Sequence, residues 1–216
     1  MLVITNIKTS RIPNRVNLVF SDQSYLPFLI DDVIKLSLTK NSPIDQSKLD
    51  LILNASLKYL GIEYALRQIA ISPKTEKILT FKLKQFFKKT TQKFKLFSGY
   101  SYLATVEGIV SELNSKNLLN PANFVFYFIN KNKSKSKSQI KFLLARQGID
   151  ISQFNLDQTL PDNDLSAITK FLSKKKITSK DIANFNAKSK IYASLFRRGF
   201  QMSDIKAAID DYLKLK

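Results

Sequence analysis

The chain lacks the side chains with which most enzymes do chemistry. Its 216 residues include no cysteine and no histidine, which excludes thiolate nucleophiles, disulfides, the usual zinc sites and histidine acid–base catalysis. The carboxylates with the most suggestive setting are Asp162 and Asp204, whose surroundings loosely resemble a metal-dependent nuclease motif. Both lie at expected helix starts, where aspartate is an ordinary N-cap. We therefore expect no enzymatic activity, no metal and no cofactor.

Charge is the property that most narrows the choice of partner. Lysine and arginine number 35 against 17 acids, which gives a formal net charge of +18. Such a surplus favours a polyanionic partner, which is a nucleic acid, an anionic membrane or an acidic protein surface. The sequence is also rich in Lys, Asn, Ile and Phe, which AT-rich codons encode. Codon usage is therefore an alternative explanation for part of the positive charge.

No segment predicts membrane insertion or export. The densest apolar run, FVFYFI at residues 124–129, is far shorter than the roughly 20 residues that span a bilayer. The N-terminal MLVITNIKTSRIPN has no apolar core of the length that a secretory signal needs. We expect a cytoplasmic monomer without membrane contact.

Arginine is rare and occurs at repeated positions. Only six of the 35 cations are arginines, and three of the six flank Gly148 and Gly199. The planar guanidinium grips a carboxylate or phosphate with two parallel hydrogen bonds, which lysine cannot do. There is a structural alternative, because a cation in the last helical turn stabilises the helix dipole and glycine supplies a left-handed cap. Arg197 lies off the expected apolar face of its helix, which favours contact with a partner.

Lysine runs complete the candidate interface. Residues 131–138 (KNKSKSKS) and 173–180 (SKKKITSK) lie in connections or at helix ends, and residues 82–89 (KLKQFFKK) lie in a helix. Such runs are often only solvated surface, but equivalent positions of stacked repeats align along one edge, which favours a continuous basic track. The candidate partner-binding or nucleic-acid-binding residues are Lys137, Lys141, Arg146, Lys174, Lys175, Lys176, Lys188, Lys190, Arg197 and Arg198.

Aromatic residues are plentiful, with 16 phenylalanines and 8 tyrosines. Most of them recur at the spacing of a helix core. We therefore expect these side chains to pack in the interior and not to stack on bases. The four that lie nearest the basic runs are Tyr127, Phe142, Phe196 and Phe200.

The hydropathy pattern changes near residue 29. Before it, alternating residues and turn signals predict a short β-hairpin within the first 28 residues. After it, a period of three to four residues predicts helices almost to the C-terminus. A short helix leads to a turn at residues 41–43, and a longer helix follows with Asp45 or Ser47 as its cap. Ser72 is expected to cap the next helix.

Two segments near the C-terminus repeat one pattern. KSQIKFLLARQGI begins at Lys137, and KSKIYASLFRRGF begins 51 residues later at Lys188. At an offset of 59 residues, the preceding helices repeat the apolar spacing Ile109–Leu113–Leu118 and Ile168–Leu172–Ile177. LTFKL at residues 79–83 belongs to a degraded third copy. We therefore predict an all-α protein of tandem three-helix repeats that form an elongated curved body, with a short N-terminal β-hairpin.

The predicted organisation has five segments. They are the β-hairpin (1–28), two leading helices (29–60), a degraded first repeat (61–100), a second repeat (101–160) and a third repeat (161–216).

Three motifs stand in a fixed order along the chain: SPKTEKILTFKL at residues 72–83, VEGIVSELNSKNLLNPANFVFYFIN at 106–130 and KSKIYASLFRRGFQMSDIKAAI at 188–209. They resemble, in that order, the first, second and C-terminal repeats of the RecX family, the regulators of the RecA recombinase. The last motif is the most similar, because it matches the family pattern L-x-[RK]-R-G-F-x-x-x-x-I-x-x-[AV]-[IL]. The chain departs from the family at Asn120–Pro121–Ala122, where acids are usual.

The resemblance implies a function by binding. Family members bind in the helical groove of the RecA–DNA filament and modulate it, usually by inhibiting ATP hydrolysis and strand exchange or by promoting filament disassembly. The resemblance implies no cofactor. The expected partners are the RecA filament and, weakly and without sequence preference, single-stranded DNA. A stand-alone, sequence-nonspecific DNA-binding module is the alternative, because both functions need a basic track.

Overall fold

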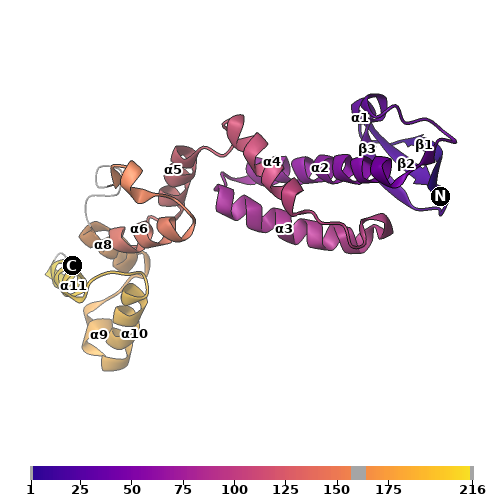
Figure 1. The fold of residues 1–216 in the computed structure, drawn as a ribbon. Helices are drawn as coiled ribbons and strands as arrows, with labels where there is room; N and C mark the ends of the chain where they lie inside the picture. Colours follow the sequence, from indigo (N-terminus) through magenta and orange to yellow (C-terminus); the bar gives the residue numbers. More distant parts are fainter. Residues whose placement is uncertain (1, 157–163, 215–216) are drawn as a thin grey trace. The chain divides into compact units, whose positions relative to one another are not determined.

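The computed structural model describes residues 2–156 and 164–214, and the chain divides into two compact units. The first unit is Met1–Asn120, and the second is Pro121–Lys216. The first unit contains a small sheet and most of the longer helices, whereas the described part of the second is helical (Figure 1).

The first unit begins with a four-stranded antiparallel sheet. Its strands are β1 (Leu2–Thr9), β2 (Arg15–Phe20), β3 (Tyr25–Leu29) and β4 (Pro43–Ile44), in the order β3-β2-β1-β4. Alternate residues of β2 face the core, where Val16, Leu18 and Phe20 are buried. The residues Asn14 and Gln23, with φ of 58° and 64°, lie in the two turns of this meander.

The sheet is larger than the predicted hairpin. Three strands form within the first 29 residues, and β4 adds a fourth at the position where the sequence predicted only a turn. Asn41, with φ of 66°, turns the chain, and its N–H donates to the Ile4 carbonyl at 2.7 Å. Ile44 is then buried and pairs with Leu2. This pairing joins residues about forty positions apart, so local pattern did not reveal it.

The long helices of the first unit start at capping residues. After α1 (Ile30–Lys35), α2 (Gln46–Ile71) begins at Asp45, whose carboxylate accepts from the Lys48 N–H at 2.7 Å, as predicted. The next helix, α3 (Glu76–Lys93), is capped by Thr75 and not by Ser72. The prediction of Ser72 was wrong because Lys74 is buried here and its ammonium donates to the Ser72 carbonyl and hydroxyl. Ser72 therefore closes α2.

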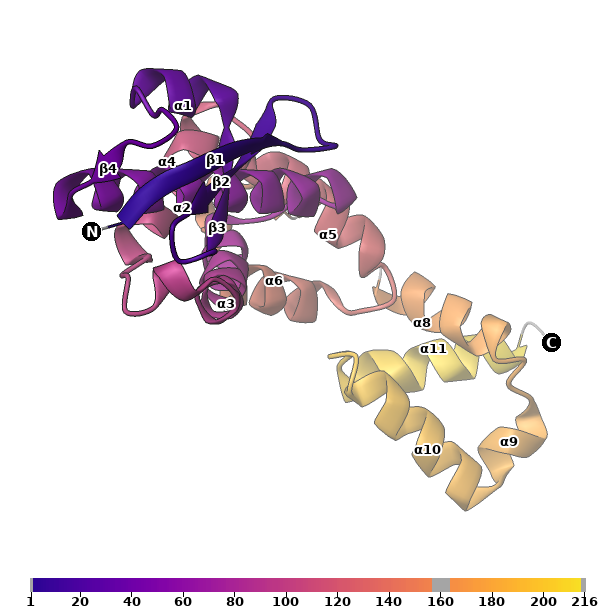
Figure 2. The same ribbon diagram turned by 90° about the vertical axis from the view of Figure 1, so that its right-hand side faces the viewer.

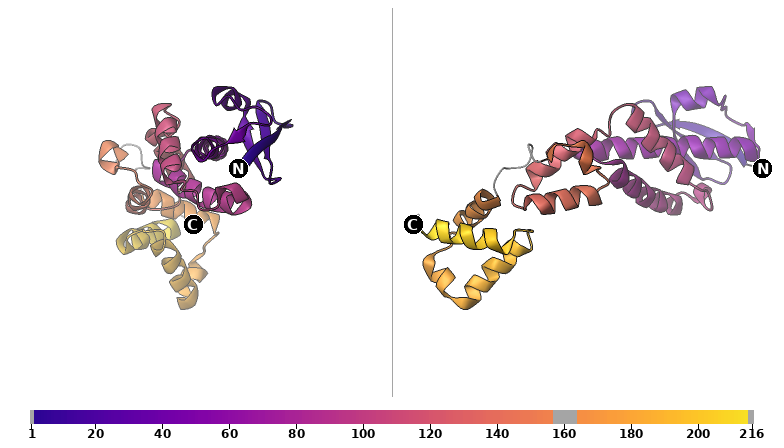
Figure 3. Two further views of the ribbon diagram at one scale, coloured as in Figure 1. Left: turned by 45° about the vertical axis from the view of Figure 1, so that its right-hand side comes forward. Right: turned by 60° about the vertical axis from the view of Figure 1, so that its left-hand side comes forward.

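Helices α2, α3 and α4 (Leu103–Ser115) pack on one another and share a single core with the sheet. The 3-10 turn η1 (Lys95–Phe97) connects α3 toward α4. Gly61 in α2 allows side chains of α3 and α4 to pack directly on the α2 backbone, since a Cβ there would lie 2.5 Å from Ile109 Cδ1 and 2.6 Å from Phe87 Cζ. Figure 2 shows α2 running across the strands, and the right-hand view of Figure 3 shows α4 crossing α2 with α3 next to both.

The described part of the second unit consists of short helices. They are α5 (Pro121–Lys131), α6 (Lys137–Arg146), the 3-10 turn η2 (Ile151–Gln153), α8 (Asp164–Lys174), α9 (Ser179–Ala183), α10 (Phe185–Phe196) and α11 (Met202–Lys214). Helices α8 and α11 pack side by side over a core that includes Ile168, Leu195 and Ile209 (Figure 2).

Residues 164–214 form four helices where the sequence predicted three. The additional helix is α9. Thr178 and Asp181 form a capping box at its start, and Asn184 ends it and caps α10 by accepting from the Ala187 N–H at 3.0 Å. Two local capping signals in close succession thus interrupt what reads as one amphipathic segment.

The predicted all-α class with a small N-terminal β element is confirmed. The five-segment division stays a prediction, and two observations bear on it. Residues 60 and 61 both lie within the continuous helix α2. Helix α4, the expected opening helix of the second repeat, packs against α2 and α3 in the first unit.

Candidate nucleic-acid interface

Helices α4, α6, α8 and α10 end in the same way, and α1 shares the pattern through the Leu38–Val33 bond at 2.9 Å with Ser37 at φ of 48°. In each, the N–H of an apolar residue donates to the carbonyl five residues earlier, across a residue with positive φ. The donor and acceptor pairs are Leu118–Leu113, Ile149–Leu144, Ile177–Leu172 and Phe200–Leu195, at 3.0, 3.2, 3.1 and 3.4 Å. The residues with positive φ are Asn117, Gly148, Lys176 and Gly199. This pattern is the Schellman C-cap. The predicted repeat of the helix ends and the predicted role of Gly199 are therefore confirmed.

Gly199 is also the point where α10 meets the start of α6. The Ser136 N–H donates to the Arg198 carbonyl at 3.0 Å, and the fully buried Ser136 hydroxyl caps α6 by accepting from the Gln139 N–H. A Cβ on Gly199 would lie 2.7 Å from Ser136 Oγ. Glycine is thus required twice, by its φ of 85° and by this close approach.

A cationic groove lies beside this junction. Its volume is about 480 Å³, and α8, the connection between α5 and α6, and the end of α10 contribute to it. The residues that line it are Lys133, Ser134, Ala167, Lys170, Phe171, Lys174, Lys175 and Arg198. Five of these eight are cations, and among the described residues that line it there is no acid. A site of this kind attracts phosphate groups.

Arg198 is held in place within the cationic groove. Its guanidinium lies over the Phe171 ring, with Cζ 4.7 Å from the ring centroid, and Nη1 donates to the Ser134 carbonyl at 3.3 Å. Arginine stacks on aromatic faces in this way and keeps further N–H donors for a bidentate contact. Lys170 and Lys174 lie one helical turn apart on the same face of α8. The groove therefore combines one oriented guanidinium with several mobile ammonium groups.

The structure brings only some of the predicted residues together. Lys174, Lys175 and Arg198 line the cationic groove, whereas Lys176 follows at the end of α8 with φ of 53°. Arg197 is exposed at the C-cap of α10 and does not line the groove. The remaining predicted residues lie elsewhere on α6 and α10 and are Lys137, Lys141, Arg146, Lys188 and Lys190.

Sequence analysis did not single out two of the lining cations, Lys133 and Lys170. Lys133 stood only within the run at 131–138, and Lys170 was missed. The signal for Lys170 was present, since Ala167, Lys170, Phe171 and Lys174 are spaced as one face of a helix. Lys133 comes from a different part of the chain, and only packing of the helices places it near α8.

The expectation that the aromatic residues pack in the core needs correction. Phe200 is buried, as expected, but Phe142 and Phe196 are 57% and 63% exposed. Arg146 lies over the Phe142 ring at 5.8 Å, and Lys131 lies over Tyr127 at 5.6 Å. The spacing that predicted burial recurs on both faces of these short helices, so periodicity alone could not select the inner face.

No group of three or more acids in the described residues is arranged to hold a metal ion. Asp204 lies in the first turn of α11, and Asp162 lies outside the described residues. No described helix is long and apolar enough to cross a membrane.

Comparison with known proteins gives a domain match and a fold match. Residues 162–209 match the family model of the RecX third three-helix domain. A crystal structure of regulatory protein RecX is 18% identical with a TM-score of 0.57, over 97% of this chain and 100% of that chain. A crystal structure of RecX from Lactobacillus salivarius is 19% identical with a TM-score of 0.52, over 73% of this chain and 97% of that one. No curated protein matches the chain. At these identities the two structures establish the likeness of fold.

Proposed function

We propose that this chain is a member of the RecX family, whose third three-helix domain matches residues 162–209, and that it regulates the RecA recombinase by binding the RecA–DNA filament. The direction of regulation that we propose is inhibition of ATP hydrolysis, strand exchange and filament growth. The domain match over residues 162–209 is the observation that carries this proposal. The protein acts by binding in this scheme and performs no chemistry of its own.

The cationic groove is the proposed contact with DNA. Four lysines and Arg198 converge on it, and the third three-helix domain contributes four of these five cations. Lysine contacts with phosphate depend on salt and not on base sequence. We therefore expect the free protein to bind single-stranded DNA weakly, without sequence preference and with steep dependence on salt.

The test is the double variant Lys170→Ala/Lys174→Ala. Both side chains are exposed, so folding should be unaffected. Each phosphate contact with a single strand contributes about 0.7 to the slope of log K against log salt, so the slope should fall by about 1.4. Titration of labelled oligonucleotide at several salt concentrations measures this slope. Inhibition of RecA ATPase on single-stranded DNA should weaken in parallel.

The matched control is Lys180→Ala/Lys206→Ala, which removes two exposed lysines of the same unit that do not line the cationic groove. If the two double variants reduce the salt slope equally, the contact with DNA is diffuse and the groove has no special role. If the wild-type protein leaves RecA activity unchanged while it binds DNA, the stand-alone DNA-binding module is the correct function.

A further inference from the structure

The first unit carries a second groove of a different character. Its volume is about 440 Å³, and it lies where α1, α2 and α4 come together. The lining residues are Leu29, Asp32, Lys35, Leu36, Leu51, Asn54, Ala55, Lys58, Tyr59, Ile62 and Glu112. One face of α2 provides most of the floor from Leu51 to Ile62, a length of about 16 Å. Leu51 is 54% exposed although it is a large apolar residue. We call this feature the α2 groove.

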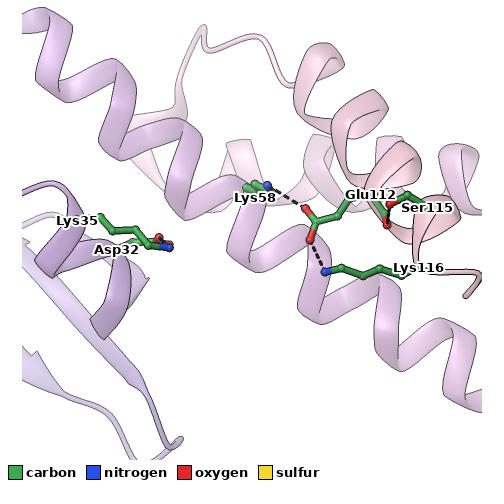
Figure 4. A network of polar contacts seen from close by, with 6 residues as sticks. All are labelled: Asp32, Lys35, Lys58, Glu112, Ser115 and Lys116. Carbon is green, nitrogen blue, oxygen red and sulfur yellow. Dashed lines mark hydrogen bonds and ion pairs between the residues drawn. The ribbon is translucent and has the colours of Figure 1, made fainter.

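Ion pairs lie along the rim of the α2 groove. Glu112 of α4 accepts from Lys58 of α2 at 2.9 Å and from Lys116 at 2.7 Å, and Asp32 and Lys35 of α1 lie 3.8 Å apart (Figure 4). Hydrogen bonds from Lys116 and then Lys58 hold the pKa of Glu112 below its usual value. Glu112 therefore remains charged at neutral pH, and Lys58 and Lys116 balance its charge.

The charge balance argues against a nucleic acid in the α2 groove. The whole chain carries +18, yet the four charged residues that line this groove, Asp32, Glu112, Lys35 and Lys58, sum to zero, and Lys116 beside Glu112 adds a single positive charge. Two fixed carboxylates would repel a phosphate backbone. An apolar floor with charges of both signs on its rim is instead complementary to an amphipathic helix, whose apolar stripe is flanked by charged residues.

We propose that the α2 groove receives the apolar face of a helix of the recombinase, so that the first unit contacts protein and the second unit contacts DNA. This inference rests on the proposed function, because it takes RecA as the protein partner. A groove about 16 Å long accommodates about three helical turns, which is enough for anchors at i, i+3 or i+4, and i+7. Leu51 is the exposed apolar residue on which such an anchor packs.

The test compares Leu51→Glu with Leu66→Glu. Both leucines are exposed on α2, at 54% and 44%, but only Leu51 lines the α2 groove. The two variants change net charge equally, so they differ in position alone. We expect Leu51→Glu to require about tenfold more protein for half-inhibition of RecA ATPase on single-stranded DNA. Leu66→Glu should match the wild type, and binding of both variants to free single-stranded DNA should be equal.

The outcomes separate this inference from the proposed function. Equal inhibition by Leu51→Glu and Leu66→Glu overturns the inference and leaves the proposed function intact. Absence of any wild-type effect on RecA overturns both. A change of the sedimenting species from dimer to monomer on Leu51→Glu also overturns the inference, because a second copy of the chain would then occupy the groove. If Leu51→Glu folds poorly, Leu51→Lys and Leu66→Lys repeat the test with the opposite charge. The same loss of RecA inhibition in Leu51→Lys, and not in Leu66→Lys, then confirms an apolar contact at position 51.

Discussion

Arg197 and Arg198 are neighbours in the sequence, but their surroundings differ. Arg198 lies against Phe171, bonds to the Ser134 carbonyl and lines the cationic groove, whereas Arg197 is exposed at the end of α10. Sequence reasoning favoured Arg197 because it lies off the apolar face of the helix. Arg198, which the sequence also predicts as an interface residue, is the one whose guanidinium is oriented beside other cations. The two arginines are therefore expected to respond differently to substitution.

Arg197→Ala should leave the free energy of unfolding within about 0.5 kcal/mol of the wild type, because an exposed side chain contributes little. Arg198→Ala should lower it by about 1–2 kcal/mol, since a cation–π contact and a hydrogen bond are both lost. Urea unfolding measures both values. In RecA ATPase assays Arg197→Ala should inhibit RecA less than the wild type does, because we propose that this arginine contacts the partner.

Gly199→Val provides the comparison for the arginine variants. A β-branched residue is strained at the positive φ of this position, and its Cβ would also clash with the Ser136 hydroxyl. We therefore expect the free energy of unfolding to fall by more than about 3 kcal/mol. A loss of stability in Arg197→Ala as large as that of Gly199→Val would show that Arg197 is a structural cap.

Helix ends are the elements that the repeats share most closely. Five of the described helices end with the same Schellman bonds, but glycine occupies the left-handed position in only two of them. Lys176 holds this position at the end of α8 with φ of 53°, a conformation that costs a side-chain-bearing residue about 1 kcal/mol. At the end of α8, a lysine of the predicted interface thus occupies a backbone conformation that suits glycine better.

Lys176→Gly should accordingly stabilise the protein by up to about 0.5 kcal/mol, because relief of about 1 kcal/mol of left-handed strain is partly offset by the added chain entropy of glycine. The midpoint of urea unfolding measures the gain. Asn117→Gly at the end of α4 is the matched variant, and its gain should be smaller since asparagine tolerates this conformation better. A lower midpoint for Lys176→Gly would show that its side chain contributes contacts that outweigh the strain.

The Lys58–Glu112 ion pair connects two elements, α2 and α4, and should make stability depend on pH. The pKa of Glu112 is lower in the folded protein than in the unfolded chain, where it is near 4.3. The ion pair therefore stabilises the folded state fully above the unfolded pKa, and this stabilisation is lost as pH falls through the folded pKa. Between about pH 5 and pH 3 the wild type should lose about 1 kcal/mol more than Glu112→Gln does. Urea unfolding across this range measures the difference, with Glu107→Gln on the same helix as control. Identical pH profiles for the wild type and Glu112→Gln would contradict the prediction.

At the scale of the whole molecule, cations outnumber acids in both units, but the charges are arranged differently. In the second unit they converge on the cationic groove, and in the first unit ion pairs surround an apolar floor. A surplus of +18 alone predicts attraction to any polyanion. Our proposals, phosphate in the cationic groove and protein in the α2 groove, rest on this arrangement within each unit and not on the total charge.

The sequence by itself determined the properties that depend on local order. The helical period after residue 29, a cap at Asp45 or Ser47 and the left-handed glycine at 199 are each set by residues within a few positions of one another, and the structure has Asp45 as the cap. Absence of cysteine and histidine likewise needs no structure. Only the tertiary structure decided the contacts between distant segments, which include β4 in the sheet and Lys133 and Lys170 beside Arg198. The physical reason is that helix periodicity fixes which residues share a face, whereas packing against other elements decides which face is buried.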